Sequence, residues 1–163
     1  LFHVSRKGPP PFVIPALYNM GLYALWGAKS ILEYRPPRMI VEVDGRRVTD
    51  NASWVQVSNI SQYGGPLVFT PGARPDDAAF EVMIQEAHER RDVLRMLWAG
   101  LVNFTAVRQY AMPDVRFFRA KRVHLASADG REAPVQIDGD PAGFLPADFD
   151  LVPGGIRVIA PPL

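Results

Sequence analysis

No cysteine occurs among the 163 residues of this chain. The absence excludes disulfide bonds, thiolate metal sites and a cysteine nucleophile. Histidine is also scarce: His3, His88 and His124 lie far apart, and none has a partner at the spacing of a metal-binding motif. Acidic residues are therefore the main candidates for any chemistry.

The common nucleotide and hydrolase motifs are missing as well. The sequence contains neither Gly-x-Gly-x-x-Gly nor Gly-x-x-x-x-Gly-Lys-Ser/Thr, so neither common phosphate-binding loop is present. It also lacks the Gly-x-Ser-x-Gly motif of serine hydrolases. The formal net charge is only +1, so nothing in the composition calls for a nucleic-acid partner.

Long apolar runs are rare. Residues 11–28 are apolar enough to raise the question of a membrane segment, but Pro15, Gly21 and Gly27 interrupt the run. A spanning helix needs about 20 predominantly apolar residues. We therefore predict a buried or membrane-facing helix here, in preference to a spanning segment or a signal peptide.

The rest of the composition is that of a globular domain. Hydrophobic residues make up 48% of the chain and charged residues 21%, and the length suits one domain. The 16 prolines bound short segments throughout the chain, which favours short strands over long helices.

Periodicity predicts a mainly β, antiparallel β-sandwich-like domain with two helices. The helices are expected over residues 12–33 and 90–103. The strands are expected at 38–48 (a hairpin turning at Asp44-Gly45), 53–60, 79–85, 114–127 (one long strand or a bent pair), 133–137 and 155–160. Residues 61–77 are rich in glycine and proline and are predicted to form a loop.

Basic residues gather in two places, and two interpretations stay open. The clusters are Arg90, Arg91 and Arg95, and then Arg116, Arg119, Lys121 and Arg122. Such residues are typical of a solvated helix end and of a protected strand edge. They could also attract anionic lipid. The near-neutral total charge favours the first interpretation.

Acidic residues occur in two glycine- and proline-rich loops. Asp76-Asp77 precedes a predicted strand, and Asp138-Gly139-Asp140 follows one. Taken alone, each is typical of a turn. The alternative is oxygen-ligand chemistry, in which carboxylates hold a hard cation such as Mg²⁺ or accept a proton from a substrate hydroxyl.

The order of several segments resembles the second domain of the diacylglycerol kinase family, which includes sphingosine, ceramide and bacterial lipid kinases. The segments are 57–59 (VSN), 63–65 (YGG), 71–82 (PGARPDDAAFEV), 134–140 (PVQIDGD), Leu145-Pro146 and 156–161. Each is weak alone, but their order and spacing together are fairly specific, and they cover most of the chain.

The resemblance implies that this chain is the C-terminal half of an ATP-dependent lipid kinase. It implies that Asp140 is the catalytic base for the lipid hydroxyl, with Asp138 beside it. The family has a glutamate at the position of Asp140, which is one methylene shorter. Asn59, Gly64 and Gly65 match positions that line the family's cleft.

The resemblance also implies a structural Mg²⁺, which bacterial members hold with one aspartate side chain and nearby carbonyls. The corresponding ligands here are the side chain of Asp77 and the carbonyls of Arg74 and Ala79. Ala78 stands where the family has glycine, so a turn with positive φ would be strained there.

The largest departure is that the family's Gly-Gly-Asp-Gly-Thr nucleotide loop does not occur. We therefore expect residues 1–163 to be a C-terminal β-rich domain that is incomplete at its N-terminus and lacks the nucleotide-binding α/β domain. The expected ligands are ATP and Mg²⁺ in the complete enzyme. The expected partners are a lipid substrate, the missing nucleotide-binding domain and, peripherally, a membrane surface, in a cytoplasmic setting. The alternatives are a non-catalytic lipid-binding or regulatory domain, and a structural β-domain in which both acidic loops are only turns.

Overall fold

The computed structural model describes residues 36–63, 67–89, 91–92, 94–95 and 112–155. The chain divides into two compact units, Leu1–Tyr34 and Arg35–Leu163, and all described residues belong to the second. The predicted helix at 12–33 and most of the predicted strand at 155–160 lie outside the described residues. Within the predicted helix at 90–103, residues 91–92 and 94–95 are described, and they are helical. No helix of the described part is long and apolar enough to cross a membrane.

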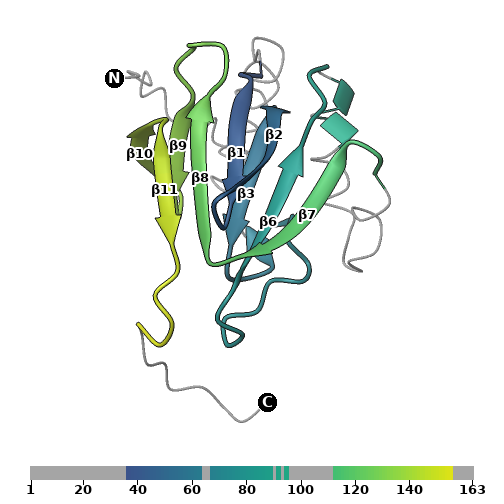
Figure 1. The fold of residues 1–163 in the computed structure, drawn as a ribbon. Helices are drawn as coiled ribbons and strands as arrows, with labels where there is room; N and C mark the ends of the chain where they lie inside the picture. Colours follow the sequence, from purple (N-terminus) through teal and green to yellow (C-terminus); the bar gives the residue numbers. More distant parts are fainter. Residues whose placement is uncertain (1–35, 64–66, 90, 93, 96–111, 156–163) are drawn as a thin grey trace, which may run out of the picture. The chain divides into compact units, whose positions relative to one another are not determined.

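Two antiparallel sheets contain most of the described strand residues (Figure 1). The larger has the order β11-β8-β1-β2 and consists of Ala147–Asp150 (β11), Arg122–Ser127 (β8), Met39–Val43 (β1) and Arg46–Ala52 (β2). The smaller has the order β3-β6-β7 and consists of Trp54–Ser58 (β3), Phe80–Gln85 (β6) and Val115–Ala120 (β7). Two short pairs complete the described strands: Pro134–Ile137 (β9) with Asp140–Phe144 (β10), and Gln62–Tyr63 (β4) with Leu67–Val68 (β5).

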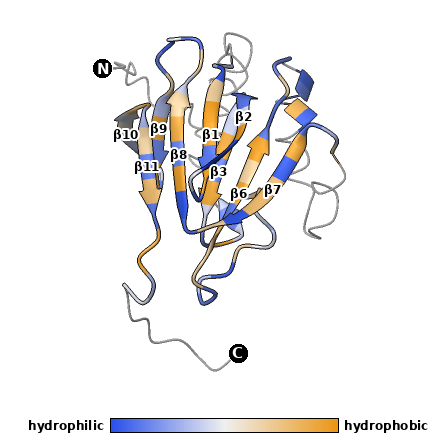
Figure 2. Ribbon diagram, in the orientation of Figure 1, coloured by the Kyte–Doolittle hydropathy of each residue, from blue (hydrophilic) through white to orange (hydrophobic). Residues whose placement is uncertain are grey.

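The main core takes side chains from both larger sheets. Val41 and Val43 of β1, Val82 and Ile84 of β6, and Val123 of β8 belong to one buried cluster. Alternate residues of a strand point to opposite faces, and Figure 2 shows this alternation as hydrophobic and hydrophilic bands along β8. Burial of each such aliphatic side chain stabilises the fold by about 1.5–3 kcal/mol. The two sheets are thus held face to face, as the predicted sandwich-like arrangement requires.

Strand β6 is buried on both faces, and its sequence FEVMIQ places apolar residues on both of them. Met83 points away from the main core and packs in a second buried cluster with Phe69 and Val115. The rings of Trp54 and Tyr63 lie 5.4 and 5.7 Å from the ring of Phe69. Tyr63 and Phe69 belong to the glycine- and proline-rich stretch 61–77, so that stretch contributes its own side chains to this second cluster.

The predicted stretch 114–127 is a bent pair whose halves belong to different sheets. Strand β7 ends at Ala120 and β8 begins at Arg122, so the chain crosses from the smaller sheet to the larger one at Lys121 (Figure 1). The carboxylate of Asp44, in the β1–β2 turn, accepts the backbone N–H groups of Lys121 and Arg122 through Oδ1, each at 2.9 Å. The bend is therefore fixed by a side chain from a different hairpin.

Four strands were not predicted. Strands β4 and β5 form a short antiparallel pair within residues 61–77, which were predicted to be a loop. The other two are β10 and β11. The sequences of β10 (DPAGF) and β11 (ADFD) carry proline, glycine or acidic residues, and every residue of β10 is exposed. Proline is tolerated in such strands where its missing N–H is not needed for pairing. Strand β11 lies at the edge of the larger sheet, and its half-buried Ala147 and Phe149 alternate with exposed Asp148 and Asp150.

Candidate functional site

The predicted catalytic pair lies at the tip of the β9–β10 hairpin. Asp138 has φ +50° and Gly139 has φ +99°. Positive φ at both central positions is typical of the tightest hairpin turns, in which Asp-Gly is a preferred pair. Asp140 follows as the first residue of β10, paired with Ile137. The local sequence thus forms a turn that brings Asp138 and Asp140 together.

Both carboxylates of this turn are exposed. Among the described residues, neither side chain makes a hydrogen bond or an ion pair. Their lone pairs are therefore open to a hydroxyl group of a ligand. General-base catalysis requires that such an oxygen come within about 2.6–3.2 Å of the hydroxyl oxygen.

A hydrogen bond joins the hairpin to the segment that leads into the predicted glycine cluster. The hydroxyl of Tyr63 donates to Oε1 of Gln136 at 2.6 Å, and Gln136 lies two residues before Asp138. Gly64 and Gly65, which follow Tyr63 directly, lie outside the described residues. Asn59 is exposed just beyond the end of β3. The structure thus brings the start of the glycine segment next to the acidic hairpin, whereas Asn59 makes no described contact with it.

The second acidic loop is organised around Asp77. Its Oδ2 accepts a hydrogen bond from Nη2 of Arg119 at 2.7 Å, and its Oδ1 accepts one from the backbone N–H of Ala79 at 3.2 Å. Ala78, between them, has φ +52°. The position therefore has the left-handed backbone that glycine adopts without strain, as the resemblance implied.

Two further interactions shape this loop. Arg74 pairs with Asp76 at 3.2 Å, and the hydrogen bond from the guanidinium lowers the pKa of Asp76 and raises that of Arg74. The buried carboxylate of Glu81 accepts the backbone N–H of Gly72 at 2.6 Å. The carboxylate of Glu81 thus holds the loop at Gly72, and the carboxylate of Asp77 holds it at Ala79.

The carboxylate of Asp77, the predicted Mg²⁺ ligand, is engaged by protein groups in the arrangement observed. Magnesium requires about six oxygen ligands in near-octahedral geometry. Both oxygens of Asp77 already accept hydrogen bonds, one of them from the positively charged Arg119. Among the described residues, no group of three or more histidine, aspartate or glutamate side chains could hold a metal. The predicted ligand role of Asp77, with the carbonyls of Arg74 and Ala79, stays a prediction.

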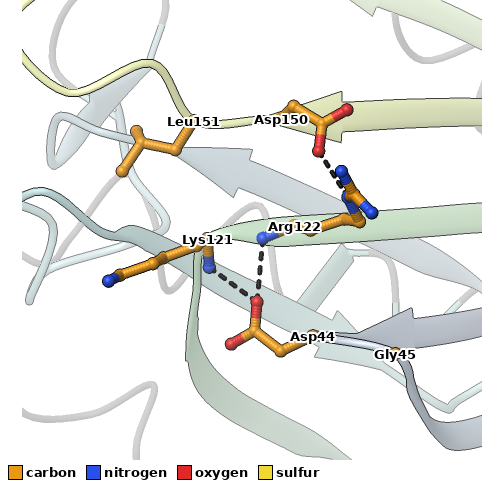
Figure 3. A pocket seen from close by; sticks show the side chains of 6 residues that line it. All are labelled: Asp44, Gly45, Lys121, Arg122, Asp150 and Leu151. Carbon is orange, nitrogen blue, oxygen red and sulfur yellow. Dashed lines mark hydrogen bonds and ion pairs between the residues drawn. The ribbon is translucent and has the colours of Figure 1, made fainter.

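A surface hollow of about 430 Å³ lies beside the β7–β8 bend (Figure 3). It is lined by Asp44, Gly45, Lys121, Arg122, Asp150 and Leu151. Nε of Arg122 donates to Oδ1 of Asp150 at 2.5 Å, and this hydrogen bond raises the pKa of Arg122. The hollow surrounds the contacts that fix the β7–β8 bend, since Asp44 in its lining accepts the backbone N–H groups of Lys121 and Arg122. Its lining contains none of the predicted site residues.

The basic cluster of residues 116–122 is largely neutralised. Arg116 pairs with Glu86 at 3.1 Å, Arg119 with Asp77 at 2.7 Å and Arg122 with Asp150 at 2.5 Å. Arginines that are each engaged by a carboxylate make a weak anion-binding surface. The pairing favours the interpretation of a protected strand edge.

Three residues that hold the acidic loops were missed by the sequence analysis: Gln136, Arg119 and Glu81. None has a local signature, because each acts on a segment brought near by strand pairing. Arg119, for example, lies opposite Glu81 in the β6–β7 register, which places it beside the loop that precedes β6. The charge of Arg119 was visible in the sequence, but its partner was not.

Comparison with known proteins agrees with this architecture. The family described as the "YegS C-terminal NAD kinase beta sandwich-like domain" matches residues 16–160. Two proteins named diacylglycerol kinase, from Mycobacterium tuberculosis strains CDC 1551 / Oshkosh and ATCC 25618 / H37Rv, are each 28% identical over 141 residues. Each alignment covers 85% of this chain and 42% of the relative. The chain thus spans less than half the length of the curated relatives that it matches.

Solved structures show the same fold. A crystal structure of a diacylglycerol kinase from Bacillus anthracis str. Sterne matches with a TM-score of 0.57 and 20% identity, over 77% of this chain and 43% of that chain. Another from the same organism, described as a candidate diacylglycerol kinase, matches with a TM-score of 0.58 and 20% identity, over 79% of this chain and 44% of that one. The family match extends over most of the chain and agrees with the observed sheets. The chain belongs to the family of C-terminal, NAD kinase-like β-sandwich domains found in lipid kinases of the diacylglycerol kinase type.

Proposed function

We propose that this chain is the lipid-side half of an ATP-dependent lipid kinase that phosphorylates the hydroxyl of diacylglycerol or a similar lipid. Asp140 accepts the proton of that hydroxyl, and Asp138 lies beside it in the same turn. The observation that carries the proposal is the hairpin tip, where two exposed carboxylates, without a partner among the described residues, stand at a turn joined through Gln136 to Tyr63.

The chemistry asked of this chain is limited. Phosphoryl transfer depends mainly on positioning and on neutralisation of the phosphate charges. In the proposal, ATP and its Mg²⁺ are supplied with a nucleotide-binding domain. The part left to this chain is to place a carboxylate oxygen within hydrogen-bond distance of the lipid hydroxyl and to take up its proton.

The shorter side chain of Asp140 fits this role if the hairpin itself reaches the substrate. The missing methylene amounts to roughly 1.5 Å of reach. Because Asp140 stands at the tip of a two-stranded pair and not within a larger sheet, a small displacement of the hairpin can make up that difference. A shape-conserving Asp140→Asn change keeps the size of the side chain while removing its ability to accept a proton.

The test is transfer of labelled phosphate from ATP to diacylglycerol by the complete kinase, formed from this chain and a nucleotide-binding domain. We expect Asp140→Asn to lower kcat by about 10²–10⁴-fold, with an unchanged unfolding transition, since general-base catalysis contributes about that much. Asp148→Asn is the matched control, because Asp148 is an exposed carboxylate on the neighbouring β11 that pairs with His124 at 2.8 Å. Wild-type turnover in Asp140→Asn would remove Asp140 from the mechanism.

A non-catalytic lipid-binding or regulatory role is the second candidate. The hairpin presents Ile137 and Phe144 with 54% and 56% of their surface exposed, which suits contact with apolar chains. The aspartate at position 140 and the alanine at position 78 also depart from the family's residues. This role is favoured if the protein binds diacylglycerol-containing vesicles but phosphorylates nothing when a nucleotide-binding domain is added. If Asp77→Ala and Asp140→Ala change neither binding nor activity, both loops are only turns.

A further inference from the structure

The register of β6 and β7 places a fixed cation beside the Asp76-Asp77 loop. Arg119 lies directly opposite Glu81 in this pairing. Successive side chains of a strand point to opposite faces. Phe118 packs against the main core, so Arg119 points to the other face, as Glu81 does next to the buried Val82. The strand pairing therefore places the side chain of Arg119 on the same face of the sheet as Glu81, next to the Asp76-Asp77 loop that precedes β6.

The contacts of Asp77 show what this cation does. Asp77 accepts a hydrogen bond from Arg119 at Oδ2, at 2.7 Å, and one from the backbone N–H of Ala79 at Oδ1, at 3.2 Å. Its side chain is only 20% exposed, whereas that of Arg119 is 59% exposed. A carboxylate so largely removed from water needs a compensating charge or several hydrogen bonds. Asp77 has the charge of Arg119 beside it and accepts two hydrogen bonds from protein groups.

Each of the three carboxylates around the loop already has a partner in the protein. Asp77 faces Arg119, Asp76 faces Arg74, and Glu81 accepts the N–H of Gly72. A divalent cation bound to Asp77 would either displace the guanidinium of Arg119 or lie next to it. Two positive charges in direct contact repel each other. Arginine stays protonated at any physiological pH, so its charge is always in place.

We propose that Arg119 takes the place of a structural metal ion at this loop. The guanidinium of Arg119 neutralises Asp77 and positions the Asp76–Ala79 turn, so that the loop of this chain is held without a divalent cation. The backbone of Ala78 is consistent with this role. Its φ of +52° is strained for a residue with a Cβ, and the hydrogen bonds of its two neighbours, Asp77 and Ala79, hold it in that conformation. The inference does not depend on the proposed kinase activity and is tested without it.

The experiment follows the thermal unfolding of the purified protein in EDTA and in millimolar MgCl₂ at matched ionic strength. For the wild type we expect the same Tm in both buffers. Arg119→Gln is expected to lower Tm by about 2–4 °C, the shift for a loss of stability at the upper end of surface ion pairs in a domain of this size. Mg²⁺ is expected to restore part of that loss, because the carboxylate of Asp77 is then open to it. Arg119→Lys, which keeps the charge, is expected to stay insensitive to Mg²⁺.

Arg122→Gln is the matched control, since Arg122 is an exposed arginine that pairs with Asp150 away from the loop. Its Tm is expected to be the same in EDTA and in MgCl₂. A wild-type Tm that rises saturably with Mg²⁺, and that no longer does so in Asp77→Asn, would overturn the proposal. So would an Arg119→Gln protein with the wild-type Tm in EDTA. If Arg119→Gln does not fold in EDTA, the Mg²⁺ response of the wild type and of Arg119→Lys decides the question.

Discussion

Tyr63 donates its phenolic hydroxyl to Oε1 of Gln136 at 2.6 Å, across 73 residues of sequence. The ring of Tyr63 packs on Phe69 in the second buried cluster, with centroids 5.7 Å apart. One side chain therefore connects a buried aromatic cluster to the hairpin that carries Asp138 and Asp140. The position of the acidic turn depends on this link as well as on strand pairing.

Tyr63→Phe removes the hydroxyl and keeps the ring. We expect the free energy of unfolding to fall by about 0.5–1.5 kcal/mol, the usual contribution of one hydrogen bond. In the complete kinase we expect turnover to fall as well, because the hairpin loses one of its anchors. Urea unfolding measures the first effect and a lipid phosphorylation assay the second.

A double-mutant cycle with Gln136→Leu separates the hydrogen bond from other effects of the two changes. If the bond is real, the loss in the double variant is smaller than the sum of the single losses. Strict additivity would mean that the two side chains do not interact in solution, and the link between the cluster and the hairpin would then be abandoned.

Ala78→Gly tests the backbone strain at φ +52°. A left-handed backbone costs a residue with a Cβ roughly 1–2 kcal/mol, and glycine avoids this cost. About half of the gain is cancelled, because glycine has more conformational freedom in the unfolded chain. We expect the free energy of unfolding to rise by about 0.5–1 kcal/mol, measured by urea titration. Ala79→Gly is the control: the backbone of Ala79 is not left-handed, so glycine there is expected to destabilise the protein. Destabilisation by Ala78→Gly would show that the loop does not hold this conformation.

Much of the fold was predictable because the core strands carry regular patterns. Residues 38–48 turn at Asp44-Gly45, as expected, and β6 lies within the predicted strand at 79–85. These segments are buried on one face or both, so their hydropathy is set by position. Strand β10 was missed because all of its residues are exposed, so polar residues, glycine and proline are tolerated there and no alternation is enforced. Strand β11 does alternate, but its four residues, ADFD, are too few for the pattern to be recognised.

The candidate site was only partly predictable, for a related reason. Asp138-Gly139 could be recognised as a turn from local chemistry, and its φ angles of +50° and +99° confirm that prediction. The side chains that hold the two acidic loops could not be recognised from the sequence. Arg119 contacts Asp77 across 42 residues of sequence, and Tyr63 contacts Gln136 across 73. Such pairs follow from strand register, which depends on the whole sheet. The catalytic role of Asp140 and Asp138 stays a prediction.

Asp129, in the connection between β8 and β9, makes the stability of the protein depend on pH in the acid range. Its carboxylate accepts hydrogen bonds from the guanidinium of Arg131 and from the backbone N–H groups of Arg131 and Arg38. The guanidinium of Arg131 is the largest cause of the lowered pKa of Asp129, which lies well below its usual range. A carboxyl whose pKa is depressed on folding stabilises the protein above its unfolded pKa of about 4, and this contribution is lost as pH falls below that value.

Asp129→Asn is therefore expected to lower the Tm at neutral pH and to narrow its difference from the wild type as pH falls from about 4 towards 2. Thermal unfolding between these limits checks the sign. Arg131→Gln should show the same convergence, since it removes the other member of the pair. A difference that grows towards low pH would contradict the assigned cause.

Substitutions at Asp138 can separate its role in the turn from a role in catalysis. Asparagine tolerates positive φ and has nearly the same shape as aspartate, so Asp138→Asn should keep the hairpin and remove only the charge. Asp138→Val places a β-branched residue at φ +50° and is expected to cost about 1–3 kcal/mol. If Asp138 serves only the turn, kinase activity follows stability: it is kept in the asparagine variant and reduced in the valine variant. If Asp138 assists Asp140 through its charge, activity falls in the asparagine variant while the urea midpoint does not change. The two roles thus predict opposite results for a single stable protein, and the comparison shows whether this hairpin contributes one functional carboxylate or two.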